Sequence, residues 1–176
     1  MRFLNQIFIF ANIALLTSCA SSRERLPSLT DGKVGIQNSL TLREEVSKTD
    51  LMSRARLFFA ENHLTDNDVI QIDDENSGVI YGRAFVKVSY GLRLSYFKMY
   101  YTFKVECGTG SYKYTLRNVY AHGSGLEIPA EKYWSMPMGR KPGHAIGDEL
   151  RAIAKRLEIA MERKIPSYTS NGAVKN

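Results

Sequence analysis

Three histidines and two serines are the side chains in this chain that are best suited to nucleophilic catalysis. They are His63, His122 and His144, with Ser124 and Ser135 as candidate nucleophiles. A histidine that takes the proton of a serine activates it, so a hydrolase that uses His122 or His144 is one alternative. No Gly-x-Ser-x-Gly turn supports it, and no histidine has the spacing to a cysteine or another histidine that a metal site needs. We therefore expect a protein that is not an enzyme and has no metal or cofactor, and keep the hydrolase as an alternative.

Two acidic stretches, 66–68 and 73–76, contain oxygen atoms of the kind that bind calcium. In a calcium loop that begins at Asp73, Gly78 occupies the sixth position, where the loop needs a glycine. The twelfth position is Ala84, although the loop needs a glutamate there. The stretch is therefore predicted to form a hairpin turn, and a looser cation site remains an alternative.

The chain begins with a short apolar leader that ends at a cysteine. Arg2 supplies a positive charge, and residues 3–16 are too few to span a bilayer, which takes about 20 apolar residues. The letters LTSC at 16–19 resemble the bacterial lipobox, whose cysteine is lipidated and becomes the first residue after cleavage. The resemblance implies a lipoprotein signal peptide over 1–18 and a lipid anchor on Cys19 in the membrane of a cell envelope.

The leader also bears on location and on partners. Ala20 follows the cysteine where an aspartate would favour the inner membrane; by resemblance to enteric sorting rules, this indicates the outer membrane, facing the periplasm. Several acyl chains anchor firmly, since each buried CH₂ contributes about 0.8 kcal/mol. Such an address excludes nucleic acid as a partner. An ordinary signal peptide or a signal anchor, and the inner membrane, remain alternatives.

Composition indicates a basic globular domain. The chain is 44% hydrophobic and carries 24 lysines and arginines against 18 acids, a net charge of +6. A basic surface favours anionic partners such as lipid head groups, polysaccharides or acidic proteins. Only Cys107 remains once Cys19 carries lipid, so no disulfide within the chain is available. Cys107 is predicted to be a buried apolar residue, with a reactive thiol as the alternative.

Hydrophobic periodicity predicts an α+β fold. It has a single antiparallel sheet of about five strands, in the order β-α-β-β-β-β-α, with two helices packed on one face. Strands are expected at 34–42, 69–72, 79–88, 96–107 and 112–122, and helices at 49–63 and 145–164. Phe58 and Phe59 should lie in the core. The expected organisation is a lipidated tether over 19–33, one domain over 34–165 and a disordered tail over 166–176.

The alternation of strand side chains indicates which face of the sheet is open. Each long strand has one apolar row, expected to meet the helices, and one row that mixes aromatic and basic residues. Asn118 and Tyr120 fall by parity in the apolar row. The predicted binding face comprises Tyr81, Arg83, Phe85, Lys87, Tyr96, Lys98, Tyr100, Lys104, Lys113 and Arg117. An ordinary solvated face is the alternative.

A long segment, 123–144, is expected to be irregular, and long loops of this kind are often functional. It contains Trp134, Met136 and Met138, which are candidates for contact with a partner. These side chains are also suited to pinning the loop onto the edge of the sheet.

Several segments resemble a known family. They are LMSRARLFF at 51–59, VI at 69–70, DDENSG at 73–78, VIYGR at 79–83 and YKYTLRNV at 112–119. They resemble a bacterial domain of unknown function with a fold like that of the TATA-binding protein, common in Gram-negative envelope lipoproteins. The resemblance extends over about 34–122 and, by element order, the last helix. Phe58-Phe59 stands where the family often has a tryptophan. The family supplies no catalytic residues, and its namesake receives DNA on an open sheet, so only the geometry is expected to carry over.

Together these features predict a non-enzymatic envelope lipoprotein that binds an acidic protein or glycan through the open face of its sheet. The alternatives are an assembly subunit that forms a homodimer through the same face, or a small hydrolase.

Overall fold

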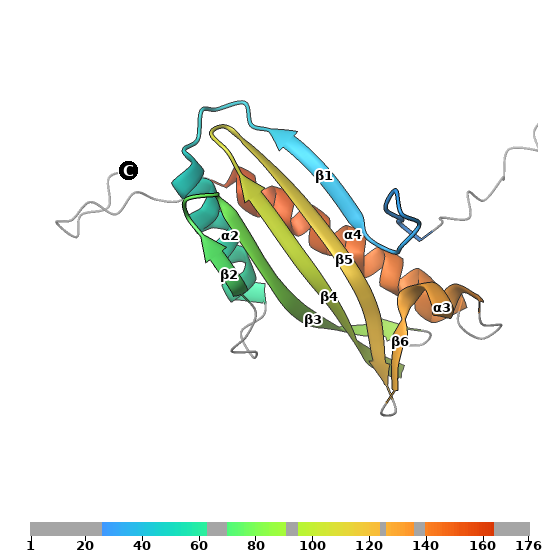
Figure 1. Cartoon of the computed structure of the whole chain (residues 1–176). Coiled ribbons are helices and arrows are strands. Elements are labelled where there is room, and N and C mark those ends of the chain that lie inside the picture. Colours follow the sequence, from blue (N-terminus) through green and yellow to red (C-terminus); the bar gives the residue numbers. More distant parts are fainter. Residues whose placement is uncertain (1–25, 63–69, 91–94, 124–125, 136–139, 164–176) are drawn as a thin grey trace, which may run out of the picture.

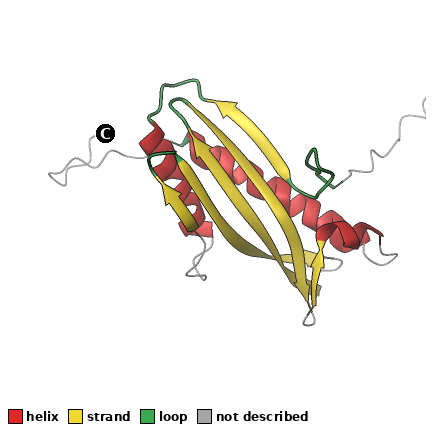
Figure 2. Ribbon diagram, viewed as in Figure 1, coloured by secondary structure: helices red, strands yellow, loops and turns green. Residues whose placement is uncertain are grey.

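A single antiparallel sheet organises the protein. The computed structural model describes residues 26–62, 70–90, 95–123, 126–135 and 140–163. Its elements are β1 (Ile36–Thr41), α2 (Lys48–Asn62), β2 (Ile70–Asp74), β3 (Val79–Tyr90), β4 (Ser95–Cys107), β5 (Ser111–Gly123), β6 (Leu126–Pro129), α3 (Ala130–Ser135) and α4 (Arg140–Glu162). The helices lie on one side of the sheet (Figures 1 and 2). The predicted α+β class with one antiparallel sheet is confirmed, with six strands and with α3 as a further short helix.

The sheet has the strand order β1-β5-β4-β3-β2, and β6 also pairs with β5. The three long strands β3, β4 and β5 form its centre through two successive hairpins. β1 and β6 share one edge of β5, because β1 pairs with residues 111–116 and β6 with residues 120–123. At the other edge the short β2 pairs with residues 79–82 of β3.

The core lies between the helices and one face of the sheet. Phe59 of α2 is fully buried and stacks on Phe103 of β4, with ring centroids 3.5 Å apart. Phe58 is buried beside it, so the prediction that this pair anchors the core is confirmed. α4 contributes a stripe with helical spacing: Ile146, Leu150, Ile153, Leu157 and Met161, each at most 1% exposed. Burial of a side chain of this size stabilises the fold by about 1.5–3 kcal/mol.

Local sequence explains where both long helices begin. Ser47 caps α2: its hydroxyl oxygen accepts a hydrogen bond from the Asp50 N–H at 3.1 Å and donates to the Asp50 carboxylate at 2.8 Å. This reciprocal pair satisfies an amide that has no partner within the helix. α4 begins at Arg140, earlier than the predicted start at 145. Pro142 lies in the first turn, where a missing N–H costs nothing.

The segment predicted to be irregular, 123–144, is in part regular, and this expectation was wrong. It contains β6, α3 and the start of α4. β6 and α3 are too short to show a period in the sequence, and tertiary contacts position them instead. Ala130 is fully buried, and Glu131 accepts a hydrogen bond from the backbone N–H of Val34 at 2.8 Å. Tyr133 stacks on Phe97 with ring centroids 6.0 Å apart.

The folded part of the chain also begins earlier than the expected boundary at residue 34. Leu26 packs against the core. Ser28 forms a β-bridge with Val34, and the backbone N–H of Gly35 donates to the Pro27 carbonyl oxygen at 3.0 Å. Residues 26–33, expected to belong to the tether, are therefore part of the domain.

Candidate functional site

The sheet face opposite the helices carries the residues predicted to form a binding surface. Tyr81, Phe85, Lys98, Tyr100, Lys104 and Lys113 are partly exposed, and Arg83, Lys87, Tyr96 and Arg117 are exposed. Each alternates along its strand with residues of the buried rows on β3, β4 and β5. The strand parity deduced for these residues is therefore confirmed, while their role in binding stays a prediction.

A β-bulge in β5 brings Tyr120 and His122 to this face, although an unbroken alternation of side chains would place both on the buried face. Tyr120 pairs with Tyr100, whereas Arg117 pairs with Thr102, so β5 takes three steps where β4 takes two. The additional residue is Asn118, with φ of +52°, a left-handed conformation that asparagine adopts more readily than most residues.

The bulge reverses the alternation for the rest of β5. Val119 and Ala121 become buried at 3% and 0% exposure, and Tyr120 and His122 turn to the open face. The prediction that Asn118 and Tyr120 belong to the apolar row was wrong, because it assumed an unbroken strand. The apolar residues at 119 and 121 were the signal in the sequence that the parity changes.

Side-chain hydrogen bonds hold the bulge in place. The Asn118 amide donates to the Thr102 hydroxyl oxygen at 3.2 Å, and that hydroxyl donates to the Arg117 carbonyl oxygen at 3.1 Å. Thr102, on the neighbouring strand β4, thus supplies hydrogen bonds where the bulge interrupts the backbone ladder. The position of Tyr120 opposite Tyr100 is a consequence of this local structure.

Aromatic rings from three strands meet on the open face. Tyr100 stacks on Tyr120 with ring centroids 5.2 Å apart and planes within 7° of parallel. Phe85 lies on the other side of Tyr100 at 5.4 Å, and His122 contacts Tyr100 edge-on at 6.3 Å. Contacts of this kind add about 0.5–1.5 kcal/mol to the burial of the rings, so this arrangement fixes the side chains before any partner binds.

Two cations lie over these rings. The Arg83 guanidinium carbon is 5.1 Å from the Tyr100 centroid and 5.0 Å from the Tyr120 centroid. The Lys98 ammonium nitrogen is 4.4 Å from the Phe85 centroid. Cation–π attraction contributes about 0.5–1 kcal/mol at exposed sites. We call Arg83, Phe85, Lys98, Tyr100 and Tyr120 the cation–aromatic cluster.

The charge around this cluster is positive and is not neutralised by the described residues. Lys87 pairs directly with Lys98 across the two strands, an arrangement of like charges that is destabilising. Within the described ranges, no carboxylate forms an ion pair with Arg83, Lys87 or Lys98. Lys104 differs, because it forms an ion pair with Glu106 at 2.8 Å. The predicted face therefore divides: Glu106 neutralises Lys104, whereas Arg83, Lys87 and Lys98 have no such partner among the described residues.

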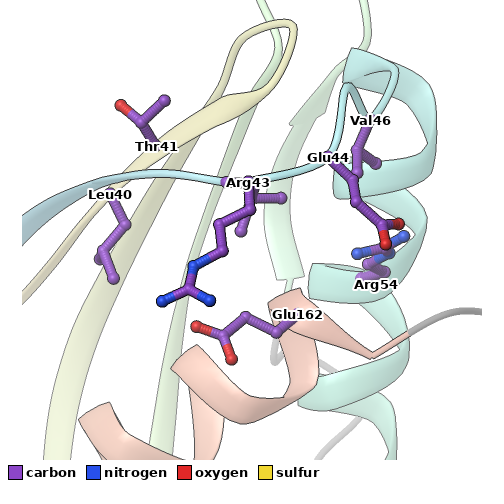
Figure 3. A pocket seen from close by; sticks show the side chains of 8 residues that line it. Leu40, Thr41, Arg43, Glu44, Val46, Arg54 and Glu162 are labelled. Carbon is purple, nitrogen blue, oxygen red and sulfur yellow. The ribbon is translucent and has the colours of Figure 1, made fainter.

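A cavity of about 500 Å³ lies between β1, the segment that follows it, α2 and the end of α4 (Figure 3). Arg54 lines it, is only 8% exposed and donates a hydrogen bond to the Met161 carbonyl oxygen in the last turn of α4. The negative end of a helix favours a cation there. Figure 3 shows Arg43 extended toward Glu162 across this cavity. The lining residues are Leu40, Thr41, Leu42, Arg43, Glu44, Val46, Arg54 and Glu162.

This cavity is a weaker candidate than the sheet face. Its two arginines and two glutamates give it no net charge, so it does not favour a ligand of either sign. The contact of Arg54 with α4 gives this buried arginine a structural role, which is to tie the two long helices together.

The acidic loop at 73–76, which is the alternative cation site, makes contacts that stabilise the fold. Asp73 forms an ion pair with Arg56 of α2 at 2.6 Å. Asp74 accepts hydrogen bonds from Ser77 and Asn76 within the predicted turn, and the bond from the Ser77 hydroxyl is the main reason that the pKa of Asp74 is lowered. Among the residues that the structure describes, no group of three or more histidine, cysteine or acidic side chains could hold a metal ion.

Several predicted residues lie outside the part of the chain whose side chains are described. They are Cys19, His63, Ser124, Trp134, Ser135, Met136 and Met138. Of the two histidines in the hydrolase alternative, His122 lies on the open sheet face and His144 on α4, which packs against the opposite face. In the described ranges, no helix is long and apolar enough to cross a membrane.

Cys107 is buried at 6% exposure, and burial raises its pKa to about 11. Because the thiolate is the reactive form, we expect iodoacetamide at pH 8 to alkylate Cys107 at least about 100-fold more slowly in the folded protein than in urea. Peptide mass spectrometry of the Cys107 peptide over time measures both rates. Equal rates would contradict the buried thiol and would support the reactive alternative.

The architecture around this site, a sheet with helices on one face and an open second face, is that of the TBP-like class. Residues 43–121 match the family model described as "Domain of unknown function (DUF4468) with TBP-like fold". The chain therefore contains a DUF4468 domain, as the resemblance of its segments implied.

Two solved structures share the fold. A TBP-like protein from Parabacteroides distasonis ATCC 8503 has a TM-score of 0.66 at 12% identity, over 79% of this chain and 98% of that one. A DUF4468 family protein from Bacteroides ovatus ATCC 8483 has a TM-score of 0.60 at 16% identity, over 79% of this chain and 91% of that one. No curated protein matches the chain.

Proposed function

We propose that this protein is a non-enzymatic envelope lipoprotein, anchored through lipid on Cys19, that binds an acidic protein with its open sheet face. The observation that supports this most directly is the position of Arg83, which lies over Tyr100 and Tyr120 without a carboxylate partner among the described residues. A guanidinium held in this way keeps its N–H groups available for a bidentate carboxylate. Ordering it before binding lowers the entropic cost of association.

The two lysines that face each other support the same proposal. Lys87 and Lys98 are directly opposite across β3 and β4. A carboxylate placed between them would convert a repulsion into two attractions, each of the order of 0.2–1 kcal/mol. Binding of an anion would thus relieve this repulsion, which is the property expected of a site for anions.

The ring geometry favours an acidic protein over a glycan. Sugars stack on a ring whose flat side is open, but the Tyr100 and Tyr120 rings turn their flat sides toward each other. Arg83 covers part of the remaining ring surface. The groups left for a partner are chiefly cationic and polar, and they match carboxylates.

The same charges disfavour the homodimer alternative. If two copies met through this face, the cations of one cluster would approach those of the other. Like charges in contact cost several kcal/mol in an interface. A partner with the opposite charge fits this face better than a second copy.

Charge reversal tests the proposal in intact cells. Replacing Arg83, Lys87 and Lys98 with glutamate is expected to reduce the recovery of a crosslinked partner from membranes at least tenfold, because each change replaces an attraction with a repulsion. The matched control reverses Lys141, Lys155 and Arg163, which are exposed on or just after α4. The control should retain recovery within about twofold, since it changes net charge equally.

Two outcomes would overturn the proposal. One is undiminished recovery with the variant of Arg83, Lys87 and Lys98, provided that its thermal unfolding matches that of the control. The other is loss of the crosslink after digestion with glycosidases rather than proteases, which would assign the face to a glycan.

A further inference from the structure

We infer that the acidic partner also inserts a basic side chain, of lysine or arginine, into a notch at the edge of β5; this inference rests on the proposed function. The notch has a volume of about 550 Å³ and lies on the side of β5 that β1 and β6 share (Figure 1). β1 pairs with β5 up to Leu116, β6 pairs with it from Tyr120 onward, and the bulge at Asn118 lies between them. The residues that line the notch are Lys33, Asn118, Val119, Tyr120, Glu127, Pro129 and Glu131.

The notch adjoins the cation–aromatic cluster through Tyr120. The ring of this residue is 5.0 Å from the Arg83 guanidinium carbon, and the same residue lines the notch. Glu127 pairs with His122, which turns to the open face. Directly paired residues share a face of the sheet, so Glu127 lies on the same side as the cluster. A partner bound to the cluster therefore meets the notch as part of one surface.

The notch and the cluster have opposite charge. The lining of the notch contains two glutamates and one lysine, whereas Arg83, Lys87 and Lys98 are all cations. Glu131 is held in position, because its carboxylate accepts a hydrogen bond from the Val34 N–H at 2.8 Å. A carboxylate has two oxygens and accepts several hydrogen bonds. An ammonium or guanidinium group that enters the notch can therefore bind to an acceptor whose position is already fixed.

The rest of the lining suits the aliphatic part of a basic side chain. Val119, Tyr120 and Pro129 supply apolar surface beside the two carboxylates. Lysine and arginine bury their methylene stems along such surface and keep the charged group at polar atoms. An apolar side chain would remove water from the carboxylates without replacing its hydrogen bonds, and an acidic one would be repelled. A basic side chain therefore fits the notch best.

The sheet geometry sets the separation of the acidic and basic groups in the partner. Arg83 lies on β3, and the notch lies beyond β5, two strands away. Neighbouring strands are about 4.8 Å apart, so the two charged groups should be about 10–15 Å apart. An extended chain covers about 3.3 Å per residue. We therefore expect the base to follow or precede the acid by about four residues in an extended segment.

The test uses the purified full chain in detergent and two fluorescein-labelled peptides. The first contains Asp-Asp-Ser-Thr-Ser-Lys. The second has norleucine in place of the lysine, which keeps the apolar stem and removes the charge. Fluorescence anisotropy measures the affinity of each peptide. Because the second peptide has more net negative charge, attraction to the cation–aromatic cluster alone would make it bind more tightly. A preference for the first peptide therefore requires a site for the cation.

We expect the first peptide to bind at least about fivefold more tightly than the second. Substituting Glu127→Gln together with Glu131→Gln should reduce this preference to less than about twofold. The glutamine oxygen can still accept the hydrogen bond from Val34, so the fold is kept while the charge is lost. The matched control is Glu45→Gln with Glu61→Gln, which changes exposed carboxylates just before and on α2. This control should keep the full preference.

A second measurement does not depend on substitutions. In NMR spectra of the complex with the first peptide, we expect nuclear Overhauser contacts between the Cε protons of the peptide lysine and protons of Tyr120 or Pro129. Contacts of the lysine with other residues only would overturn its assignment to the notch.

Each remaining outcome is also decisive. If the second peptide binds as tightly as the first or more tightly, and Arg83→Glu with Lys98→Glu abolishes both, the basic anchor is wrong and the proposed function stands. A preference for lysine that survives the two glutamine substitutions at 127 and 131 overturns the notch as its site. If neither peptide binds at millimolar concentration, or if binding ignores the reversal of Arg83 and Lys98, the cluster does not hold an acidic segment. That result overturns the inference and also counts against the proposed function.

Discussion

Replacing Phe59 with alanine is expected to lower the free energy of unfolding by about 3–5 kcal/mol. The side chain is fully buried, stacks on Phe103 at 3.5 Å and meets Phe58 edge-on at 5.1 Å. Its removal loses the transfer free energy of the ring and leaves a cavity between α2 and the centre of the sheet. Domains of this size have a total stability of about 5–15 kcal/mol, so this single change would remove a large share of it.

Urea unfolding followed by circular dichroism measures this effect. The matched control is Leu57→Ala, on the neighbouring position of α2, where the side chain is 44% exposed. The control should change stability by no more than about 0.5 kcal/mol. A loss of stability in the Phe59 variant as small as that of the control would contradict the packing of α2 on β4.

Replacing Gly78 with alanine is the second change with a large expected effect, a loss of about 3 kcal/mol or more. Gly78 has φ of +72°, a conformation that costs a residue with a side chain about 1–2 kcal/mol. In addition, a Cβ atom would fall on the carbonyl oxygen of Cys107 and would lie 3.0 Å from the side chain of Lys48. The substitution would therefore disturb the hydrogen bond from Cys107 N–H to the Gly78 carbonyl oxygen, which joins the β2–β3 turn to β4.

Gly110→Ala separates the conformational cost of a positive φ from the steric conflict of an added Cβ atom. Gly110 has φ of +66°, and a Cβ atom there would meet nothing within 4 Å. Its replacement should cost only the conformational strain of about 1–2 kcal/mol. The difference between the two variants in urea unfolding measures the steric conflict at Gly78. Equal losses would show that no such conflict exists.

Much of the fold could be predicted from the sequence where one buried face makes apolar residues recur at regular intervals. The stripe from Ile146 to Met161 has helical spacing because one side of α4 covers the sheet. The alternation in β3 and β4 is regular because one face of each strand is buried and the other is wet. In both elements a single physical constraint acts over many residues, so the pattern is strong.

The remainder depends on contacts between segments that are distant in the sequence. β6 has only four residues, all at least partly exposed, and it exists because β5 offers an edge to pair with. The bulge at Asn118 depends on Thr102 of the neighbouring strand. Because this bulge turns Tyr120 outward, a central member of the candidate site was missed although its strand was predicted. Arg83, Phe85, Lys98 and Tyr100 were predicted because no bulge interrupts their strands between positions 79 and 90 of β3.

If Cys19 carries the proposed lipid, the early start of the folded domain limits the distance between the domain and the membrane. Residue 26 is already packed on the core, so only the chain from 19 to 26 would separate the domain from the proposed lipid. Fully extended, that length spans about 25 Å. A domain held at this distance by the proposed lipid would stay within a thin layer beside the bilayer. If the proposed acidic partner lies at the same membrane, the short distance would raise the effective concentration of the two proteins.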